Sequence, residues 1–216
     1  VFPISAGRHI YKREPSFPIA VACDPAFNFV YEANIRYLHH LGEVTYFSPL
    51  ADTSLPDAGF VYLPGGYPEL YLAALSANRQ MLQSIRRYVE SGGKLLAECG
   101  GMMYLCDEIR DKNGDVYPMA GVLHQSATME NMKLRLGYRT LLYNETRLKG
   151  HEFHYSRLVE QQNPLPSCAV AYTAKGVETD TPLYHYKNVW AGYTHLYWAD
   201  PVGNEWFTKF VIDGNT

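Results

Sequence analysis

The sequence has little net charge, few cysteines and no long apolar run. Its 216 residues carry 19 Lys and Arg against 22 Asp and Glu, and the net charge of −3 argues against nucleic acid or an anionic membrane surface as the main partner. No apolar run is long enough to span a bilayer, and no signal peptide is visible. We therefore expect a cytoplasmic protein that binds neither nucleic acid nor membrane.

Cysteine usage excludes two further kinds of site. The four cysteines have neither metal-ligand spacing nor the pattern of a disulfide framework: Cys23, Cys99, Cys106 and Cys168. Free thiols are typical of a reducing compartment, which agrees with a cytoplasmic location. The sequence predicts no metal site.

One local pattern, His151-Glu152-Phe153-His154, is superficially like a metal site. A zincin helix needs two His four residues apart, and these two are three apart. On a strand, residues 151 and 154 face opposite sides, whereas Glu152 and His154 share a face. Two interpretations stay open: Glu152 and His154 line a functional site, or they form a satisfied strand pair.

Hydrophobic periodicity predicts an α/β domain in the first half of the chain. Helical spacing is found over Phe29–Leu41, after a candidate N-cap at Asn28, and over Leu70–Ser91. Around these segments lie apolar runs that predict buried strands: Ile19–Ala22, Val44–Phe47, Phe60–Leu63 and Leu95–Ala97. The alternation predicts a mainly parallel central sheet with helices on both faces.

After Ile109 the pattern changes to short segments rich in Tyr and Thr. They predict antiparallel strands and hairpins at residues 119–122, 134–143, 149–159 and 169–172. A last strand, predicted over Val189–Trp198, is expected to join the central sheet.

The two ends of the chain differ in character. Pro201–Ile212 predicts a C-terminal helix, with Trp206 and Phe210 four residues apart and packed inward. Val1–Phe17 is irregular and predicts a linker or tail. The folded domain is therefore expected to span residues 18–213.

Cys99 stands where a predicted strand turns into a predicted helix. Leu95–Ala97 has the pattern of a buried strand, and Met102–Leu105 opens a helix after Gly100 and Gly101. A nucleophile at such a bend is typical of a nucleophile elbow. The helix N-terminus predicts a lowered thiol pKa, and the Gly100 N–H is expected to point at a developing oxyanion. The alternative is a buried structural cysteine.

Two further features lie at the ends of predicted strands. Gly65-Gly66 follows Phe60–Leu63 and offers bare backbone N–H groups where a ligand can approach. His195 lies near the end of the last predicted strand, and imidazole has a pKa suited to hold a thiol proton. A cysteine, a histidine and backbone donors together predict acyl transfer through a thioester.

Four ordered motifs resemble the class I glutamine amidotransferase domain of the cobyrinate a,c-diamide synthase family. They are Leu63-Pro64-Gly65-Gly66-Tyr67-Pro68-Glu69, Ala97-Glu98-Cys99-Gly100-Gly101-Met102-Met103-Tyr104-Leu105, Gly150-His151-Glu152-Phe153-His154-Tyr155-Ser156 and Tyr193-Thr194-His195. The resemblance covers residues 17–212 and implies a flavodoxin-like three-layer α/β sandwich, with antiparallel strands added to a mainly parallel sheet.

The resemblance also implies a role for each candidate residue. Cys99 would attack the glutamine carboxamide, and His195 would raise its nucleophilicity and protonate the leaving ammonia. Backbone N–H groups near Gly66 and Gly100 would form the oxyanion hole. The remaining candidates for lining the site are Gly65, Glu152 and His154.

The implied function is the release of ammonia from glutamine for ATP-dependent amidation of the a and c carboxylates of cobyrinic acid in cobalamin biosynthesis. ATP and Mg²⁺ would belong to an N-terminal ligase domain, and no P-loop motif occurs in this sequence. The chain is therefore expected to be the amidotransferase half without a cofactor of its own, with Val1–Phe17 as the linker remnant. Its expected partners are glutamine, the ligase domain and a corrinoid acceptor.

The sequence departs from the general class I pattern at Tyr197. Many class I amidotransferases carry Glu two residues after the catalytic His, and the cobyrinate-type branch resembled here lacks it. The group that would orient His195 is left open. Other functions also stay open: the same role in cobyric acid synthase or in nickel-sirohydrochlorin a,c-diamide synthase, a non-catalytic amidotransferase-like binding domain, or a cysteine peptidase or other hydrolase.

Overall fold

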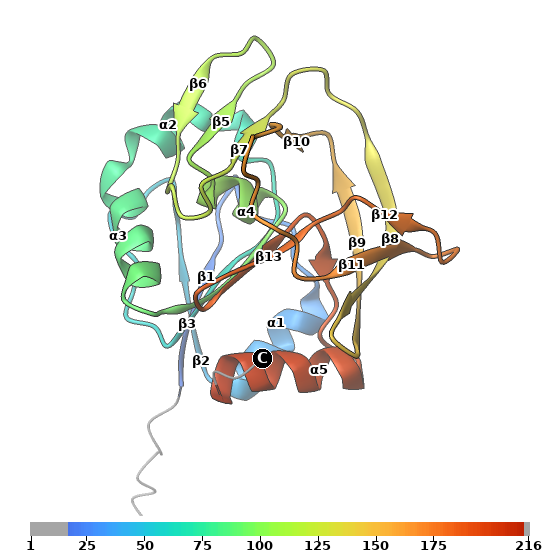
Figure 1. Cartoon of the computed structure of the whole chain (residues 1–216). Helices are drawn as coiled ribbons and strands as arrows, with labels where there is room; N and C mark the ends of the chain where they lie inside the picture. Colours follow the sequence, from blue (N-terminus) through green and yellow to red (C-terminus); the bar gives the residue numbers. More distant parts are fainter. Residues whose placement is uncertain (1–16, 214–216) are drawn as a thin grey trace, which may run out of the picture.

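A computed structural model describes residues 17–213 of the chain. The central sheet has the strand order β13-β14-β4-β3-β1-β2 (Figure 1). Its parallel strands are β1 (Pro18–Ala22), β2 (Glu43–Phe47), β3 (Phe60–Leu63), β4 (Lys94–Glu98) and β14 (Val189–Gly192). The edge strand β13 (Leu183–Tyr186) runs antiparallel to β14. The predicted α/β architecture, mainly parallel with antiparallel additions, is confirmed.

Helices cover both faces of this sheet, which makes three layers (Figure 1). One side carries α2 (Leu72–Ala77), α3 (Arg79–Glu90) and α4 (Gly100–Leu105), and the other side carries α1 (Glu32–Leu41) and α5 (Pro201–Thr208).

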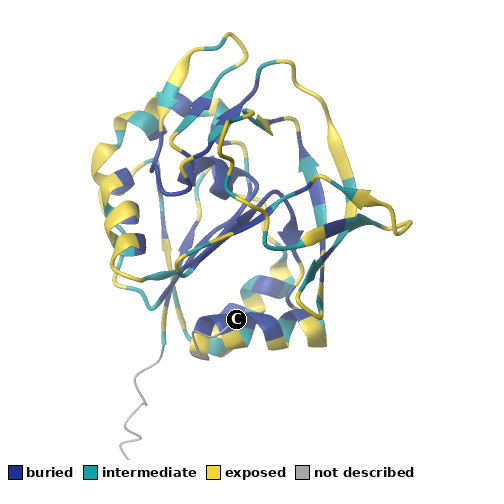
Figure 2. Cartoon of the chain, in the orientation of Figure 1, coloured by how far each residue is buried: buried dark blue, intermediate teal, exposed yellow. Residues whose placement is uncertain are grey.

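Alternation along the strands explains why both faces are covered. In β3, Val61 and Leu63 pack into the core beneath α3, whereas Phe60 and Tyr62 pack into the core beneath α1 and α5. Successive side chains of a strand point to opposite faces, so a continuous apolar run requires a layer on each side. Figure 2 shows the resulting buried centre of the molecule.

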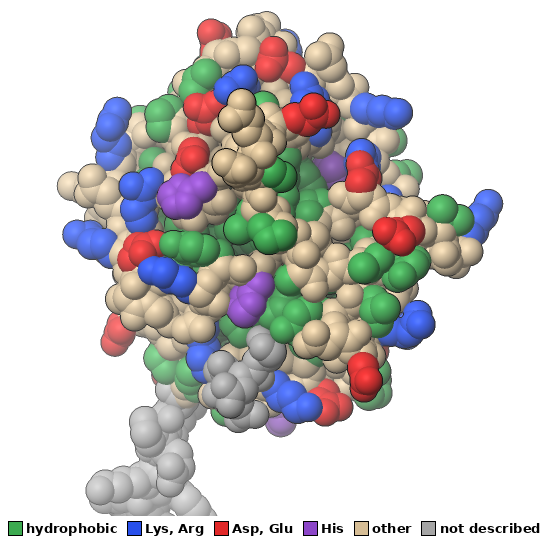
Figure 3. All heavy atoms as spheres, viewed as in Figure 1, with side chains coloured by type: hydrophobic (Ala, Val, Ile, Leu, Met, Phe, Trp, Pro, Cys, Tyr) green, Lys and Arg blue, Asp and Glu red, His purple; other side chains and the backbone are tan. Residues whose placement is uncertain are grey.

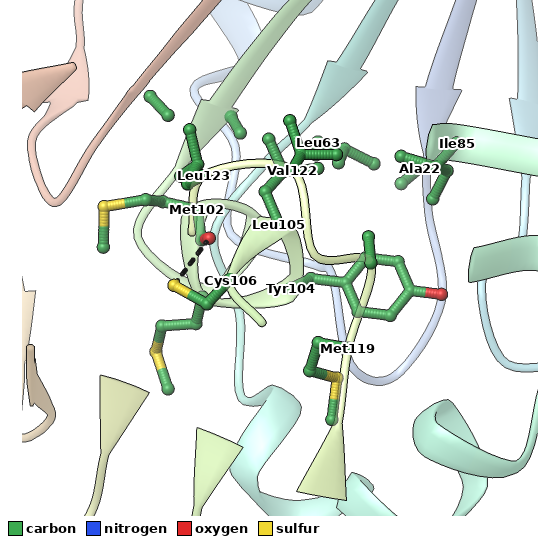
Figure 4. Close-up of a cluster of buried hydrophobic side chains, with 14 of the residues drawn as sticks. Ala22, Leu63, Ile85, Met102, Tyr104, Leu105, Cys106, Met119, Val122 and Leu123 are labelled. Carbon is green, nitrogen blue, oxygen red and sulfur yellow. Dashed lines mark hydrogen bonds between the residues drawn. The ribbon is translucent and has the colours of Figure 1, made fainter. Parts of the chain in front are cut away.

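The core beside α4 is drawn in Figure 4. Met102, Leu105 and Cys106 belong to the same buried cluster as Leu63, and the Cys106 Sγ lies 3.6 Å from the Met102 carbonyl oxygen. Every side chain of α4 is buried, so this short helix is fixed by packing rather than by its own propensity.

The second half of the chain forms two smaller sheets. One has the order β10-β7-β5-β6 and contains Arg157–Leu158, Ser126–Thr128, Glu108–Arg110 and Val116–Pro118. The other has the order β12-β11-β8-β9-β15 and contains Glu178–Thr179, Val170–Thr173, Arg135–Tyr143, Thr146–His154 and His195–Leu196. The long hairpin of β8 and β9 dominates the second sheet (Figure 1).

The first two predicted helices have different bounds in the structure. The helix predicted from Phe29 begins at Glu32, because the Phe29 N–H donates to the Gly65 carbonyl and holds that segment extended. Asn28 does not cap it. The helix predicted over Leu70–Ser91 is split at Asn78, whose side chain accepts from the Met81 N–H and begins α3.

Three predictions in the second half also need correction. Residues 119–122 form no strand; they are a buried loop held over α4 by bonds such as Ala120 N–H to the Tyr104 carbonyl. The last strand leaves the central sheet at Gly192, and His195–Leu196 joins the sheet of β9 instead. The α-helix from Pro201 ends at Thr208 and continues as a π-helical turn, Lys209–Asp213.

Two predictions about the ends of the domain have different outcomes. Trp206 and Phe210 are buried, with ring centroids 6.0 Å apart, so the inward packing of this pair is confirmed. The linker predicted over Val1–Phe17 lies outside the described residues except for Phe17, whose carbonyl accepts from the Glu43 N–H.

Candidate active site

Cys99 lies at a sharp turn between β4 and α4, as the sequence predicts. Its backbone has φ 49° and ψ −106°, which is unusual for a residue with a side chain. The Cys99 N–H donates to the Gly192 carbonyl at 2.8 Å. A Cβ on Gly101 would lie 2.1 Å from the Leu63 carbonyl oxygen, so only glycine allows α4 to start this close to β3.

The candidate oxyanion-hole glycines lie beside this turn. The Gly66 nitrogen is 3.2 Å from the position that a Cβ on Gly100 would take, so the two loops are in contact. A Cβ on Gly66 would lie 2.1 Å from the Ala26 carbonyl oxygen. The Gly100 N–H faces the Cys99 sulfur and works to lower the pKa of that thiol. The backbones of Gly66 and Gly100, the two candidates for the oxyanion hole, thus lie next to Cys99.

His195 comes from β15 and lies against the same loops. A Cβ on Gly65 would lie 2.1 Å from His195 Cε1, and the His195 ring also packs against Phe29, with ring centroids 4.4 Å apart. The pKa of His195 is lowered to about 3, mainly by burial and also by the neighbouring His151 and His154, against an opposing effect of Glu152. The imidazole is therefore neutral at physiological pH.

Glu98 is a residue of this site that the sequence analysis missed. Its side chain is 1% exposed, and its carboxylate accepts from the Tyr62 hydroxyl at 2.6 Å and from the Leu196 N–H at 3.0 Å. Its Oε2 lies 4.0 Å from His195 Nδ1. Burial raises the pKa of Glu98 to about 8 and outweighs the two hydrogen bonds. The sequence feature that could have pointed to Glu98 is its position as an ionisable residue at the end of an apolar strand, directly before Cys99.

The predicted lowering of the Cys99 pKa is wrong for this structure. Burial raises the pKa of Cys99 to about 12, the charges of Glu69 and Glu98 act in the same direction, and the Gly100 N–H only partly offsets them. The helix dipole acts at the end of a helix of six residues, whereas the sulfur is removed almost completely from water. The resting site therefore holds a neutral thiol and a neutral imidazole.

A cavity of about 20 Å³ opens beside Cys99, which is room for about one water molecule. Its lining comprises Gly66, Tyr67, Glu69, Cys99, Met103, Phe153, His154, Tyr155 and Ser156. The Cys99 Sγ lies 3.9 Å from the Phe153 carbonyl oxygen. Of the candidates from the sequence, Gly66, Cys99 and His154 line this cavity.

Glu152 and His154 share one face of β9, as predicted, and lie within ion-pair distance of each other. His154 Nε2 lies 3.5 Å from Glu152 Oε1, and Glu152 also pairs with Arg139 at 2.5 Å. Burial works to raise the pKa of Glu152, but hydrogen bonds from His154 and Thr181 and the charge of Arg139 lower it. Glu152 thus has an ion pair with Arg139 and a hydrogen bond from Thr181, whereas His154 lines the cavity at Cys99.

Three further features of the residues that the structure describes bear on other kinds of site: metal-ligating clusters, apolar helices and surface charge. Within residues 17–213, no group of three or more His, Cys, Asp or Glu side chains is arranged to hold a metal ion. No helix in the same range has the length and apolar character needed to cross a membrane. Figure 3 shows acidic and basic side chains interspersed on the face in view, without a field of one sign.

Because His195 is buried, we expect the free energy of unfolding to depend on pH. The pKa of His195 is about 3 in the folded protein against an ordinary value of 6.5, so the unfolded chain takes up a proton that the folded chain does not. Protonation of His195 does not reduce the free energy of unfolding above about pH 6.5. As pH falls from there toward 3, the free energy of unfolding decreases by up to about 1.4 kcal/mol per pH unit. Urea unfolding between about pH 5 and 7 should show a smaller fall in His195→Asn. An equal fall in both proteins would contradict the assignment.

Comparison with known proteins identifies the relatives of this chain. The family model described as "CobB/CobQ-like glutamine amidotransferase domain" matches residues 18–202. A hydrogenobyrinate a,c-diamide synthase of Pseudomonas aeruginosa is 38% identical over 202 residues, covering 91% of this chain and 45% of the relative. A cobyrinate a,c-diamide synthase of Fusobacterium nucleatum is 40% identical, covering 83% of this chain and 41% of the relative. The chain thus spans less than half the length of these relatives.

Solved structures show the same fold at much lower sequence identity. A glutamine amidotransferase of Thermotoga maritima has a TM-score of 0.54 at 12% identity, covering 92% of this chain and 83% of the other. The PurLQS structure of the same organism has a TM-score of 0.57 at 16% identity, covering 92% of this chain and 96% of the matched chain. These similarities confirm the predicted class I glutamine amidotransferase fold.

Proposed function

The chain belongs to the family of CobB/CobQ-like glutamine amidotransferase domains, and we propose that Cys99 is the nucleophile with which it releases ammonia from glutamine. The observation that carries this proposal is the strained turn at Cys99, which places the thiol beside Gly66, Gly100 and the cavity. An unusual φ/ψ at a buried cysteine is stabilised only by the surrounding fold, and such strain is typical of functional turns.

In the first half-reaction, His195 takes the thiol proton as sulfur attacks. The new S–C bond forms at the glutamine carboxamide carbon, and the C=O electron pair moves to oxygen. When the tetrahedral intermediate collapses, the C–N bond breaks, the imidazolium gives its proton to the leaving nitrogen, and ammonia departs. Water then attacks the thioester carbon while His195 takes its proton, the S–C bond breaks to release glutamate, and the imidazolium returns the proton to the Cys99 sulfur.

The raised thiol pKa and the lowered imidazole pKa bear on the timing of proton transfer. With values of about 12 and about 3, a free thiolate–imidazolium pair is unfavourable in the resting site. Proton transfer is therefore coupled to attack on the bound carboxamide, when the sulfur charge passes to the substrate oxygen. The N–H groups of Gly66 and Gly100 are proposed to receive that charge.

The position of His195 supplies a sharp test of this mechanism. In Gly65→Ala, the new Cβ would lie 2.1 Å from His195 Cε1 and would displace the ring. We expect kcat for glutamine hydrolysis to fall by about 10²-fold, because a misplaced base loses most of its contribution. An ammonia-release assay measures this, with circular dichroism to check folding. A folded Gly65→Ala protein with unchanged kcat would exclude His195 as the base.

The acceptor of the ammonia is proposed from the relatives. They are named as cobyrinate or hydrogenobyrinate a,c-diamide synthases, and we propose that the ammonia amidates the a and c carboxylates of such a corrinoid acid in cobalamin biosynthesis. Amidation needs an activated carboxylate, for which ATP and Mg²⁺ on a ligase domain are proposed. The amidotransferase half would then act in the cytoplasm with its cysteines reduced; the four are free in the structure.

The apolar outer face of the β8–β9 hairpin is the proposed docking surface for the ligase domain. Leu136, Tyr138 and Tyr155 are 55%, 73% and 42% exposed. Leu136 lies opposite Phe153 in the ladder, and both Phe153 and Tyr155 line the cavity at Cys99. The relatives are more than twice as long as the matched region, which supports a covering domain of the same polypeptide.

A further inference from the structure

The mechanism needs a group that orients His195, and Tyr197 does not provide a carboxylate. Tyr197 is 38% exposed, and its ring packs against Tyr31 with centroids 5.7 Å apart. No described residue gives His195 Nδ1 a hydrogen-bond partner, and the nearest acid is Glu98, whose Oε2 lies 4.0 Å away.

We propose that Glu98 is the positioning residue of this site: its carboxylate holds His195 through Nδ1 and leaves Nε2 to accept the Cys99 proton. The inference rests on the proposed function of Cys99 and His195. It places the orienting acid immediately before the nucleophile in the chain, rather than two residues after the histidine.

Both oxygens of Glu98 are fixed in the required place. Oε1 accepts from the Leu196 N–H at 3.0 Å, which ties β4 to the residue that follows His195. Oε2 accepts from the Tyr62 hydroxyl at 2.6 Å, and this is also the oxygen that faces Nδ1. A shift of about 1 Å would turn the contact with Nδ1 into a hydrogen bond, and catalytic hydrogen bonds often tighten only when substrate binds.

The hydrogen bonds that Glu98 accepts from Tyr62 and Leu196 do not by themselves require an ionisable side chain. A buried carboxyl away from water is unfavourable unless it is bonded, and a Gln could also accept from the Leu196 N–H and fill the same place in β4. The groups that face it come from several elements: Tyr31 before α1, Tyr62 of β3, Cys99 after β4, His195 of β15 and the Trp198 indole. Beyond His195 lie the charged or titratable groups of β9: His151, Glu152 and His154.

Above its pKa of about 8, Glu98 is ionised and selects the useful tautomer of His195. A carboxylate accepts only, so Nδ1 must carry the proton and Nε2 is left as the acceptor. In Glu98→Gln the amide oxygen must stay at the Oε1 position to accept from the Leu196 N–H. The NH₂ group then takes the Oε2 position and donates to Nδ1, so the proton moves to Nε2 and the base is blocked.

The decisive variant is therefore Glu98→Gln, assayed for glutamine hydrolysis in this chain. We expect kcat to fall by about 10²- to 10⁴-fold, the range of general base catalysis, with KM for glutamine within about threefold. Glu108→Gln, which loses only its pairing with Arg110 in another sheet, should keep full activity. A folded Glu98→Gln protein with kcat within threefold of the parent would overturn the proposal.

Tyr62→Phe gives an independent readout if Glu98→Gln fails to fold. The Tyr62 hydroxyl donates to the ionised carboxylate and so lowers the pKa of Glu98, which is about 8. Without it, the acid limb of kcat against pH should move up by about 1 pH unit. A structural role alone would lower stability and leave the limb in place, and an unmoved limb in the folded variant overturns the proposal.

The ring nitrogens of His195 test the inference apart from glutaminase activity. At pH 9, ¹⁵N NMR of the parent should show Nδ1–H, and Glu98→Gln should show Nε2–H, with signals assigned by His195→Asn. If the parent shows Nε2–H at pH 9, Glu98 does not set the tautomer. If the tautomers are as expected but Cys99→Ala still hydrolyses glutamine, the proposed function fails while the positioning role of Glu98 stands.

Discussion

Cys99→Ala is expected to abolish glutamine hydrolysis, with a loss of at least about 10⁴-fold in kcat. The reaction has no other route to a thioester, because Cys99 is the cysteine that lines the cavity beside Gly66. Cys99→Ser should be nearly as inactive, since a hydroxyl is a much weaker nucleophile than a thiol at this site. Ammonia release, measured with both variants and the parent, decides the matter.

The chain offers matched controls for this experiment. Cys106 is equally buried and lies at the other end of α4, and Cys23 is exposed. Cys106→Ala and Cys23→Ala should keep the activity of the parent, apart from any loss of stability at the buried position. Glutaminase activity that survives in Cys99→Ala at a substantial fraction of the parent would exclude the thioester mechanism.

Covalent labelling of Cys99 tests the same mechanism in the protein without substrate. The thiol pKa of about 12 leaves little thiolate at pH 7, so a general alkylating agent should react slowly with Cys99. Diazo-oxo-norleucine mimics glutamine and should react faster, because binding brings the electrophile to the sulfur and the oxyanion donors. Peptide mass spectrometry should place one adduct on Cys99 and none on Cys106.

Sequence patterns predict the central sheet well because its strands are apolar on both faces. Residues such as Leu95 and Ala97 have no alternative to burial between two helical layers, and β4 lies within one residue of its predicted place. The turn at Cys99 is also predicted from neighbouring residues, because Gly100 and Gly101 follow it directly. The central strands and the turn at Cys99 can therefore be predicted from residues that are neighbours in the sequence.

Features set by distant contacts are not visible in the sequence. His195 follows β14 but pairs with His151 of β9, because the chain leaves one sheet and joins another within three residues. Glu98 becomes part of the site only through Tyr62 and Leu196, which lie 36 and 98 residues away in the chain. The thiol pKa likewise depends on burial by the assembled loops, which outweighs the helix end that the sequence reveals.

The isolated chain is expected to make no amidated tetrapyrrole and to hydrolyse glutamine slowly. Amidation needs an activated acyl group, and this sequence has no P-loop to hold ATP. The cavity at Cys99 has room for about one water molecule, so glutamine binding requires the lining to move. Tyr67 and Tyr155 line it and are 44% and 42% exposed, which makes them the groups that a covering domain would contact.

Adding the ligase domain, with ATP and acceptor present, should therefore raise glutamine turnover. A typical coupling free energy corresponds to on the order of 5- to 150-fold. Ammonia release by the chain with and without the ligase domain measures the effect. Tyr138→Ser and Leu136→Ser on the proposed docking surface should reduce the stimulation while leaving the basal rate unchanged. Val177→Ser, equally exposed in the turn between β11 and β12, is the matched control and should have no effect.

Each outcome bears on a different part of the coupling. Full turnover by the isolated chain, unchanged by the ligase domain, would show that the closed cavity does not limit catalysis. Stimulation that survives in both Tyr138→Ser and Leu136→Ser would place the docking surface elsewhere while retaining the coupling. Loss of stimulation in these variants but not in Val177→Ser would connect the outer face of the β8–β9 hairpin to the cavity, through Phe153 and Tyr155, which belong to both.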